Sequence, residues 1–133
     1  MKKTYIILIV ILVLVIGFLM IFRVGFTGGE DSWIKDDKGV YVKHGAPSGT
    51  PDYVLEQQNA ITCATDLYKS SKAEGMEFNS QCLGSCGDFA VDVVHVPRTG
   101  EDDQVENQCS AYRNGSVHSF IELNSEGEIV RIA

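Results

Sequence analysis

The sequence predicts an α+β fold: an N-terminal transmembrane helix, then one amphipathic helix packed on an antiparallel sheet of about four strands. Three observations support this prediction. An uncharged apolar run fills residues 5–22, and apolar side chains recur at helical spacing through residues 51–74. Short β-branched segments follow in the C-terminal half. Four cysteines lie after the apolar run, which predicts a disulfide-stapled domain.

The charges are unevenly spread over the 133 residues, whose formal net charge is -7. The segment 24–133 carries 8 basic and 18 acidic side chains, a net charge of -10. Nucleic-acid affinity comes largely from basic side chains that release phosphate counterions, so no nucleic-acid partner is expected. The same balance argues against this segment lying on an anionic membrane surface.

The apolar run predicts a membrane anchor. As a helix it would span roughly 27 Å, close to the ~30 Å hydrocarbon core of a bilayer. Thr4 can join the run, so the lipid bilayer is the expected partner of residues 4–22. Lys2 and Lys3 precede the run and favour a cytoplasmic N-terminus, with the C-terminal domain extracytoplasmic.

A cleaved signal peptide is the alternative, and it would release a secreted protein. Signal peptides usually have an apolar region of about 7–15 residues and a small-residue cleavage site, and this run is longer and lacks a good site. We therefore expect a single-pass protein of the cell membrane. Its parts would be an anchor over 1–23, a linker over 24–32 and an extracytoplasmic domain over 33–133.

The first elements of the domain are a short hairpin and a long helix. Apolar residues 33–34 and 40–42 flank a turn-like stretch and predict a strand or hairpin. Thr50 is a good N-cap, Pro51 suits the first helical position, and Gly75 is a suitable stop. The sequence thus predicts a helix over 51–74 with one buried face.

Strands are predicted after that helix. Residues 76–88, which hold Cys82 and Cys86, predict an irregular loop, and residues 89–96 predict a central strand that ends at Pro97. Asn114-Gly115 lies between two strand-like segments and is the strongest short signal for a β-hairpin. A last strand is expected over 128–132.

The cysteines Cys63, Cys82, Cys86 and Cys109 predict two disulfides, which fits an oxidising compartment. The sequential and the crossed pairings would each tie the helix to the loop and the loop to the sheet. Both are favoured over the nested pairing, and the choice between them stays open. A four-cysteine zinc site is the rival, but its close C-x2-C pairs are missing.

Three stretches, residues 50–58, 106–111 and 118–123, resemble small single-pass membrane-anchored proteins of archaea. The resemblance covers most of the domain and implies no activity. Asn114-Gly115-Ser116 is also a glycosylation sequon, which makes Asn114 a candidate modification site.

These patterns predict a membrane-anchored extracytoplasmic binding or accessory module, with a protein as its partner. Motifs for nucleophilic catalysis, phosphate binding or dinucleotide binding are missing, so we expect no enzymatic activity and no cofactor. The alternative is a small extracytoplasmic enzyme or metal-binding protein. It would use His95, His118 and an acidic residue, with Asp92 or Glu122 as candidates.

Overall fold

The computed structural model describes residues 5, 7, 11–18 and 31–133, which fall into two units, Met1–Asp31 and Ser32–Ala133. In the first unit, residues 11–18 are helical. Within the described residues, no helix combines the length and the apolar character needed to cross a membrane. Most of the expected membrane segment 4–22 and of the linker 24–32 lies outside the described residues.

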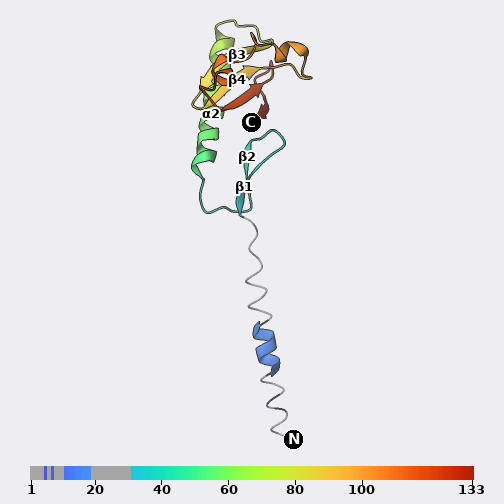
Figure 1. Ribbon diagram of the computed structural model, residues 1–133. Coiled ribbons are helices and arrows are strands. Elements are labelled where there is room, and N and C mark those ends of the chain that lie inside the picture. The colour runs from blue at the N-terminus through green and yellow to red at the C-terminus, as the bar shows by residue number, and fades with distance from the viewer. Residues whose placement is uncertain (1–4, 6, 8–10, 19–30) are drawn as a thin grey trace. The chain divides into compact units, whose positions relative to one another are not determined.

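The second unit is an α+β domain with two sheets (Figure 1). A two-stranded antiparallel hairpin comes first, followed by a long helix and a four-stranded sheet in the order β3-β4-β5-β6. The elements are β1 (Ser32–Lys35), β2 (Tyr41–His44), α2 (Asp52–Ala73), β3 (Gln81–Cys86), β4 (Phe89–Val93), η1 (Gly100–Asp103), α3 (Ser110–Arg113), β5 (Ser119–Leu123) and β6 (Ile129–Ile132).

Helix α2 confirms the predicted amphipathic helix. Its N-cap is Pro51, one residue later than the predicted Thr50, and no side chain caps it. Gly75 follows the helix with φ +82°, a conformation that glycine adopts without steric cost. One stripe of the helix is buried, and it consists of Val54, Gln57, Ala60, Ala64 and Tyr68.

The main core lies between α2 and one face of the four-stranded sheet. Ala60, Ala64 and Tyr68 of the helix pack with Val91 of β4 and Ile121 of β5. Val91 and Ile121 are both 0% exposed. Burying an aliphatic side chain this fully contributes about 1.5–3 kcal/mol, so each of these two residues stabilises the domain substantially.

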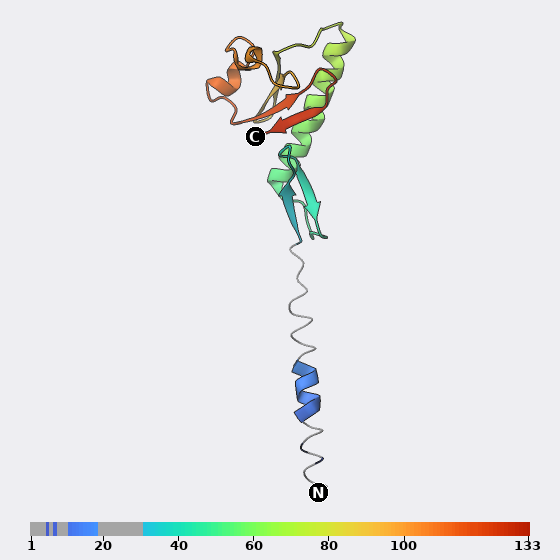
Figure 2. The same cartoon turned by 90° about the vertical axis from the view of Figure 1, so that its right-hand side faces the viewer.

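The hairpin β1–β2 is bonded to the N-terminal half of α2. The side chain of buried Gln57 accepts from the backbone N–H of Tyr41 at 2.8 Å and donates to the carbonyl of Gly39 at 2.9 Å. Gly39 has φ +83°, and a Cβ there would overlap the carbonyl oxygen of Ile132. Figures 1 and 2 show the hairpin beside that end of α2, with the larger sheet beside the rest of the helix.

The sheet is mixed, so the prediction of an antiparallel sheet is only partly correct. β3 with β4, and β5 with β6, are antiparallel, but β4 and β5 run parallel, with Val91 opposite Ile121. Parallel neighbours need a connection of about a dozen residues or more. Residues 94–118, called the crossover below, make that connection on the face of the sheet away from α2 (Figure 2).

The predicted hairpin at Asn114-Gly115 is wrong, because the residues before it form the helical turn α3. A type I′ turn needs positive φ at both residues. Here Asn114 has φ -91° and Gly115 has φ +75°. The pair therefore ends a helical turn, a position where glycine is also favoured.

The predicted loop over residues 76–88 contains strand β3 instead, and this strand is irregular. Its pairing with β4 shifts register between Cys82 and Gly84. In a regular strand, residues four apart share a face. The shift turns Cys82 toward the crossover face, opposite Asp92, whereas Cys86 joins the core beneath α2.

Two disulfides are present, and they have the crossed pairing. Cys63 of α2 joins Cys86, and Cys82 joins Cys109 of the crossover. Because β3 presents its two cysteines to opposite faces, it is linked covalently to the layer on each side.

Candidate functional site

A polar cleft of about 120 Å³ lies on the crossover face of the sheet. The ends of β4, β5 and β6 form its floor, and the crossover forms its walls. Its charged side chains come from both, and they are Asp92, Arg98, Asp102, Glu122 and Arg131.

Glu122 is the centre of the charge network in this cleft. Its side chain is 8% exposed and pairs with Arg98 at 2.7 Å and with Arg131 at 3.1 Å. Arg131 is its cross-strand partner on β6. Arg98 also binds the exposed carboxylate of Asp103 at 2.9 Å. The hydrogen bond to Glu122, with a further one to Asp103, raises the pKa of the Arg98 guanidinium.

Asp92 lies beside Glu122 across the parallel pair β4–β5. Burial raises its pKa to about 6, and the neighbouring Glu122 carboxylate adds to this rise. A hydrogen bond from the backbone N–H of Cys109, at 3.0 Å, and the charge of Arg98 lower it in part. Asp92 therefore gains and loses its proton near neutral pH.

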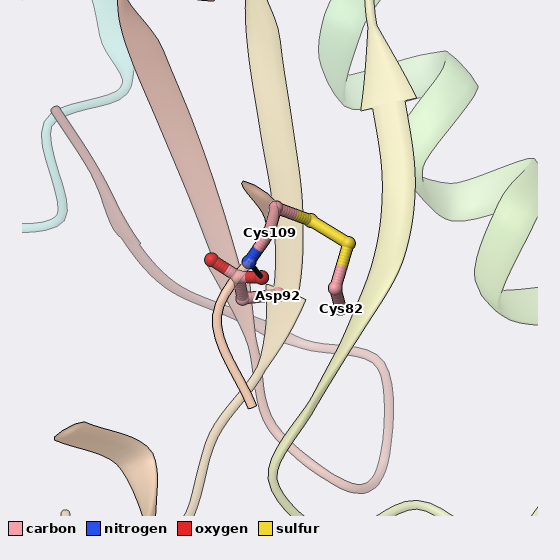
Figure 3. Close-up of side chains that lie close together, drawn as sticks. All are labelled: Cys82, Asp92 and Cys109. Atoms are coloured by element: carbon pink, nitrogen blue, oxygen red, sulfur yellow. Dashed lines mark hydrogen bonds between the residues drawn. A yellow bond between two sulfur atoms is a disulfide. The ribbon is translucent and has the colours of Figure 1, made fainter. Parts of the chain in front are cut away.

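The sulfur atoms of Cys82 and Cys109 lie close to this carboxylate. One oxygen of Asp92 and the two sulfurs all lie within 4.8 Å of one another (Figure 3). Among the described residues, this is the only group of three ligand-type side chains with such spacing. Because the sulfurs form a disulfide, they are not the thiolates that bind metals.

His95 lies at the start of the crossover and is held by Asp102. Its backbone N–H donates to Asp102 Oδ1 at 3.0 Å, and its ring Nδ1 lies 3.0 Å from the same oxygen. Thr99 completes a capping box with Asp102, whose Oδ2 accepts from the Thr99 backbone at 2.7 Å. Burial alone would raise the pKa of Asp102, but hydrogen bonds from Thr99, His95 and Ser80 hold it well below the usual carboxyl range.

His118 lies at the end of the crossover and has the same pattern of hydrogen bonds to an aspartate. Its backbone N–H donates to Asp88 Oδ1 at 3.0 Å, and its Nδ1 lies 2.9 Å from that oxygen. Both side chains are largely exposed, 75% for His118 and 55% for Asp88. The two histidines therefore have separate aspartate partners, and no three-ligand group among the described residues contains either of them.

The other predicted site residue, Asn114, lies exposed at the end of α3, where its side chain accepts from the backbone N–H of Ser116 at 2.9 Å. Its glycosylation stays a prediction.

Sequence reasoning named Asp92 and Glu122 only as partners for the histidines. Their position as charged residues inside apolar strands was the available signal for a site. Arg98 and Asp102 gave no such signal, because the path of the crossover brings them to the sheet.

No family model, curated protein or solved structure matches this chain significantly. The resemblance to membrane-anchored proteins of archaea stays a prediction.

Proposed function

We propose that this protein is a membrane-anchored extracytoplasmic binding module whose cleft receives a cationic side chain of a partner protein. The location rests on two observations. The apolar run of residues 5–22 has the length of a membrane anchor. Two disulfides in one small domain fit an oxidising, extracytoplasmic compartment.

The observation that supports the binding role is that the Asp92 carboxylate has no salt-bridge partner among the described residues. Glu122 and Asp103 each have an arginine as a salt-bridge partner, and Asp102 accepts hydrogen bonds from the backbone N–H groups of His95 and Thr99. Among the described residues, Asp92 forms no salt bridge; it accepts a hydrogen bond from the Cys109 backbone N–H and feels the charge of Arg98 without contacting it. A partly buried carboxylate that no cation contacts directly is complementary to an incoming ammonium or guanidinium group.

The walls of the cleft are held rigidly, which suits a preformed binding site. Its walls are held by the disulfide at Cys109 and by Arg98, which bridges the crossover to Glu122. Its volume of about 120 Å³ matches the end of a lysine side chain better than a free substrate.

A metal-binding role is the second candidate, because an aspartate on Nδ1 is the usual support for a histidine that binds metal through Nε2. Each histidine here would supply a single ligand. We expect Zn²⁺ to leave the chemical shifts of both rings unchanged at equimolar concentration. Tight binding at either ring would favour the second candidate.

The binding role is tested by NMR on the full-length, disulfide-intact protein in detergent micelles. The reporter is the Cys109 amide, which donates to Asp92. N-acetyl-lysine methylamide should shift this resonance near pH 7, and the uncharged norleucine analogue should not. The shift should fade as Asp92 is protonated below its pKa of about 6, and Asp92→Asn should abolish it. Equal shifts from both probes would refute a cation site.

The anchoring role has a separate test. The full-length chain should remain with membranes after alkaline carbonate extraction and should float with vesicles. Recovery of a soluble chain that begins near residues 24–30 would show instead that the run is a cleaved signal peptide.

A further inference from the structure

We propose that the β1–β2 hairpin is a membrane-interface contact that rests among the lipid headgroups of the bilayer holding the N-terminal anchor. This inference depends on the anchoring part of the proposed function. It assigns a role to a surface that lies apart from the polar cleft.

One face of the hairpin combines aromatic rings with lysines; its rings are half-buried, and that of Tyr41 packs partly on Tyr53 of α2, with the ring centres 4.9 Å apart. Trp33 pairs across the strands with Lys43, and Tyr41 pairs with Lys35. The Lys43 ammonium lies 5.6 Å from the centre of the Trp33 ring, and the Lys35 ammonium lies 5.2 Å from that of Tyr41. Tryptophan and tyrosine concentrate at membrane–water interfaces, where lysines extend their charge toward the headgroups.

The opposite face adds apolar surface. Ile34 and Val42 are cross-strand partners, and they remain 44% and 37% exposed. Exposed aliphatic pairs of this kind suit the boundary between headgroups and acyl chains.

Charge separates the hairpin from the rest of the domain. Three of the 8 basic side chains of residues 24–133 belong to the hairpin, namely Lys35, Lys38 and Lys43. Its two acids, Asp36 and Asp37, are exposed in the turn, so three lysines against two acids leave residues 32–44 with a net charge of +1. Asp36 also accepts from the backbone N–H groups of Lys38 and Val40. The domain as a whole is repelled by anionic lipids, and the hairpin is the part that anionic lipids repel least.

The covalent connection keeps the hairpin near the bilayer. Residues 23–31 separate the end of the apolar run at residue 22 from Ser32. At ~3.5 Å per residue, these residues extend over at most about 30 Å. An inserted anchor therefore holds the hairpin at a high effective concentration beside the headgroups, so that a weak contact is enough.

The hairpin is also rigid enough to transmit this contact. The Trp33 indole N–H donates to the Gly49 carbonyl at 2.9 Å, and Gln57 bonds the hairpin to α2. A hairpin seated on the membrane would therefore fix the orientation of the domain rather than move independently.

The test uses Trp33, the single tryptophan of the chain, as a fluorescent reporter. The full-length protein is reconstituted in phosphatidylcholine vesicles with phosphatidylglycerol, with or without a spin label on the lipid headgroups. We expect the label to quench Trp33 about twofold or more, with weak quenching by aqueous acrylamide. Strong acrylamide quenching with no effect of the label would overturn the proposal.

A charge-matched pair of variants sharpens the result. Lys35→Gln with Lys43→Gln should weaken the contact about thirtyfold, at ~1 kcal/mol for each lysine near an anionic surface, and should remove most of the quenching. The control, Lys69→Gln with Arg113→Gln, changes the net charge equally outside the hairpin and should keep the quenching. Equal effects of both pairs would overturn a specific hairpin contact.

Flotation of the same vesicles distinguishes failure of the membrane anchor from failure of the hairpin contact. Protein that floats without headgroup quenching would refute the hairpin contact alone. Protein that does not float would refute the anchor and, with it, the contact that depends on it.

Discussion

The two ends of the crossover use the same hydrogen-bond pattern in different surroundings. At each end, a histidine directs both its backbone N–H and its Nδ1 to one oxygen of an aspartate. At the opening end, Asp102 is 0% exposed and His95 is 31% exposed. At the closing end, Asp88 and His118 are 55% and 75% exposed.

We call each of these histidine–aspartate contacts a clamp. Because the two clamps have the same bonds, their difference in burial should decide how much each one contributes to the free energy of unfolding. Exposed pairs typically contribute about 0–1 kcal/mol, because water competes for both partners. Removing a buried acceptor leaves its donors without water or any other partner, at a cost of about 1–3 kcal/mol or more. The crossover is therefore expected to be held firmly at its opening end and loosely at its closing end.

The largest expected effect comes from the disulfide that ties the crossover to β3. Cys82→Ser with Cys109→Ser opens a loop with a sequence separation of 27, which should lower the free energy of unfolding by about 3–4 kcal/mol. Removing Cys63–Cys86, with a separation of 23, should cost a similar amount and serves as the control. Urea unfolding measures both.

Limited trypsin digestion then distinguishes the two disulfide variants. Arg98 and Arg113 are exposed residues of the crossover. Loss of Cys82–Cys109 should speed cleavage at both arginines more than loss of Cys63–Cys86. Equal rates would mean that the disulfide does not hold the crossover in place.

The next effect compares the clamps directly. Asp102→Ala should lower the free energy of unfolding by about 2–3 kcal/mol, because the backbone N–H groups of His95 and Thr99 lose a buried acceptor. Asp88→Ala removes the same pattern at the surface and should cost less than about 1 kcal/mol. Thermal unfolding of the two variants side by side measures the difference, and similar losses would contradict the role given to burial.

A smaller effect than that of Asp102→Ala, and of opposite sign, concerns Asp92 of β4. Its folded pKa of about 6 exceeds the ordinary 3.8, so its protonation stabilises the fold. This stabilisation is complete below the ordinary value and is lost as pH rises through about 6. Asp92→Asn should therefore raise the free energy of unfolding near pH 7 by about 1–2 kcal/mol, after allowance for solvent screening of a partly buried group.

Urea unfolding as a function of pH tests this expectation. The variant should lose the part of the pH dependence that Asp92 causes between its ordinary and its folded pKa. An unchanged pH dependence would contradict it. A carboxyl group that lowers stability at neutral pH is typical of a binding site rather than of a structural ion pair.

Local signals in the sequence predicted the parts of the fold that local physics decides. Helix α2, with its apolar stripe and its stop at Gly75, is one case, and the hairpin around Lys38-Gly39 is another. The even number of cysteines likewise indicated two disulfides.

The parts that failed depend on contacts between distant residues. The parallel pairing of β4 with β5 is decided by how the crossover packs, which no short pattern records. Asn114-Gly115 suits both a hairpin and the end of a helical turn, and the tertiary context selected the second. Asp102 reaches the site through that same crossover, so its role was hidden for the same reason.

The register shift in β3 has a consequence for oxidative folding. Cys82 and Cys86 are close in sequence, so in an unfolded chain each can react with either distant partner at a similar rate. Only after β3 has paired with β4 in the shifted register do the two thiols face different layers. A chain that is oxidised before the sheet forms can acquire non-native disulfides. It would then need thiol–disulfide exchange to reach the native pairing.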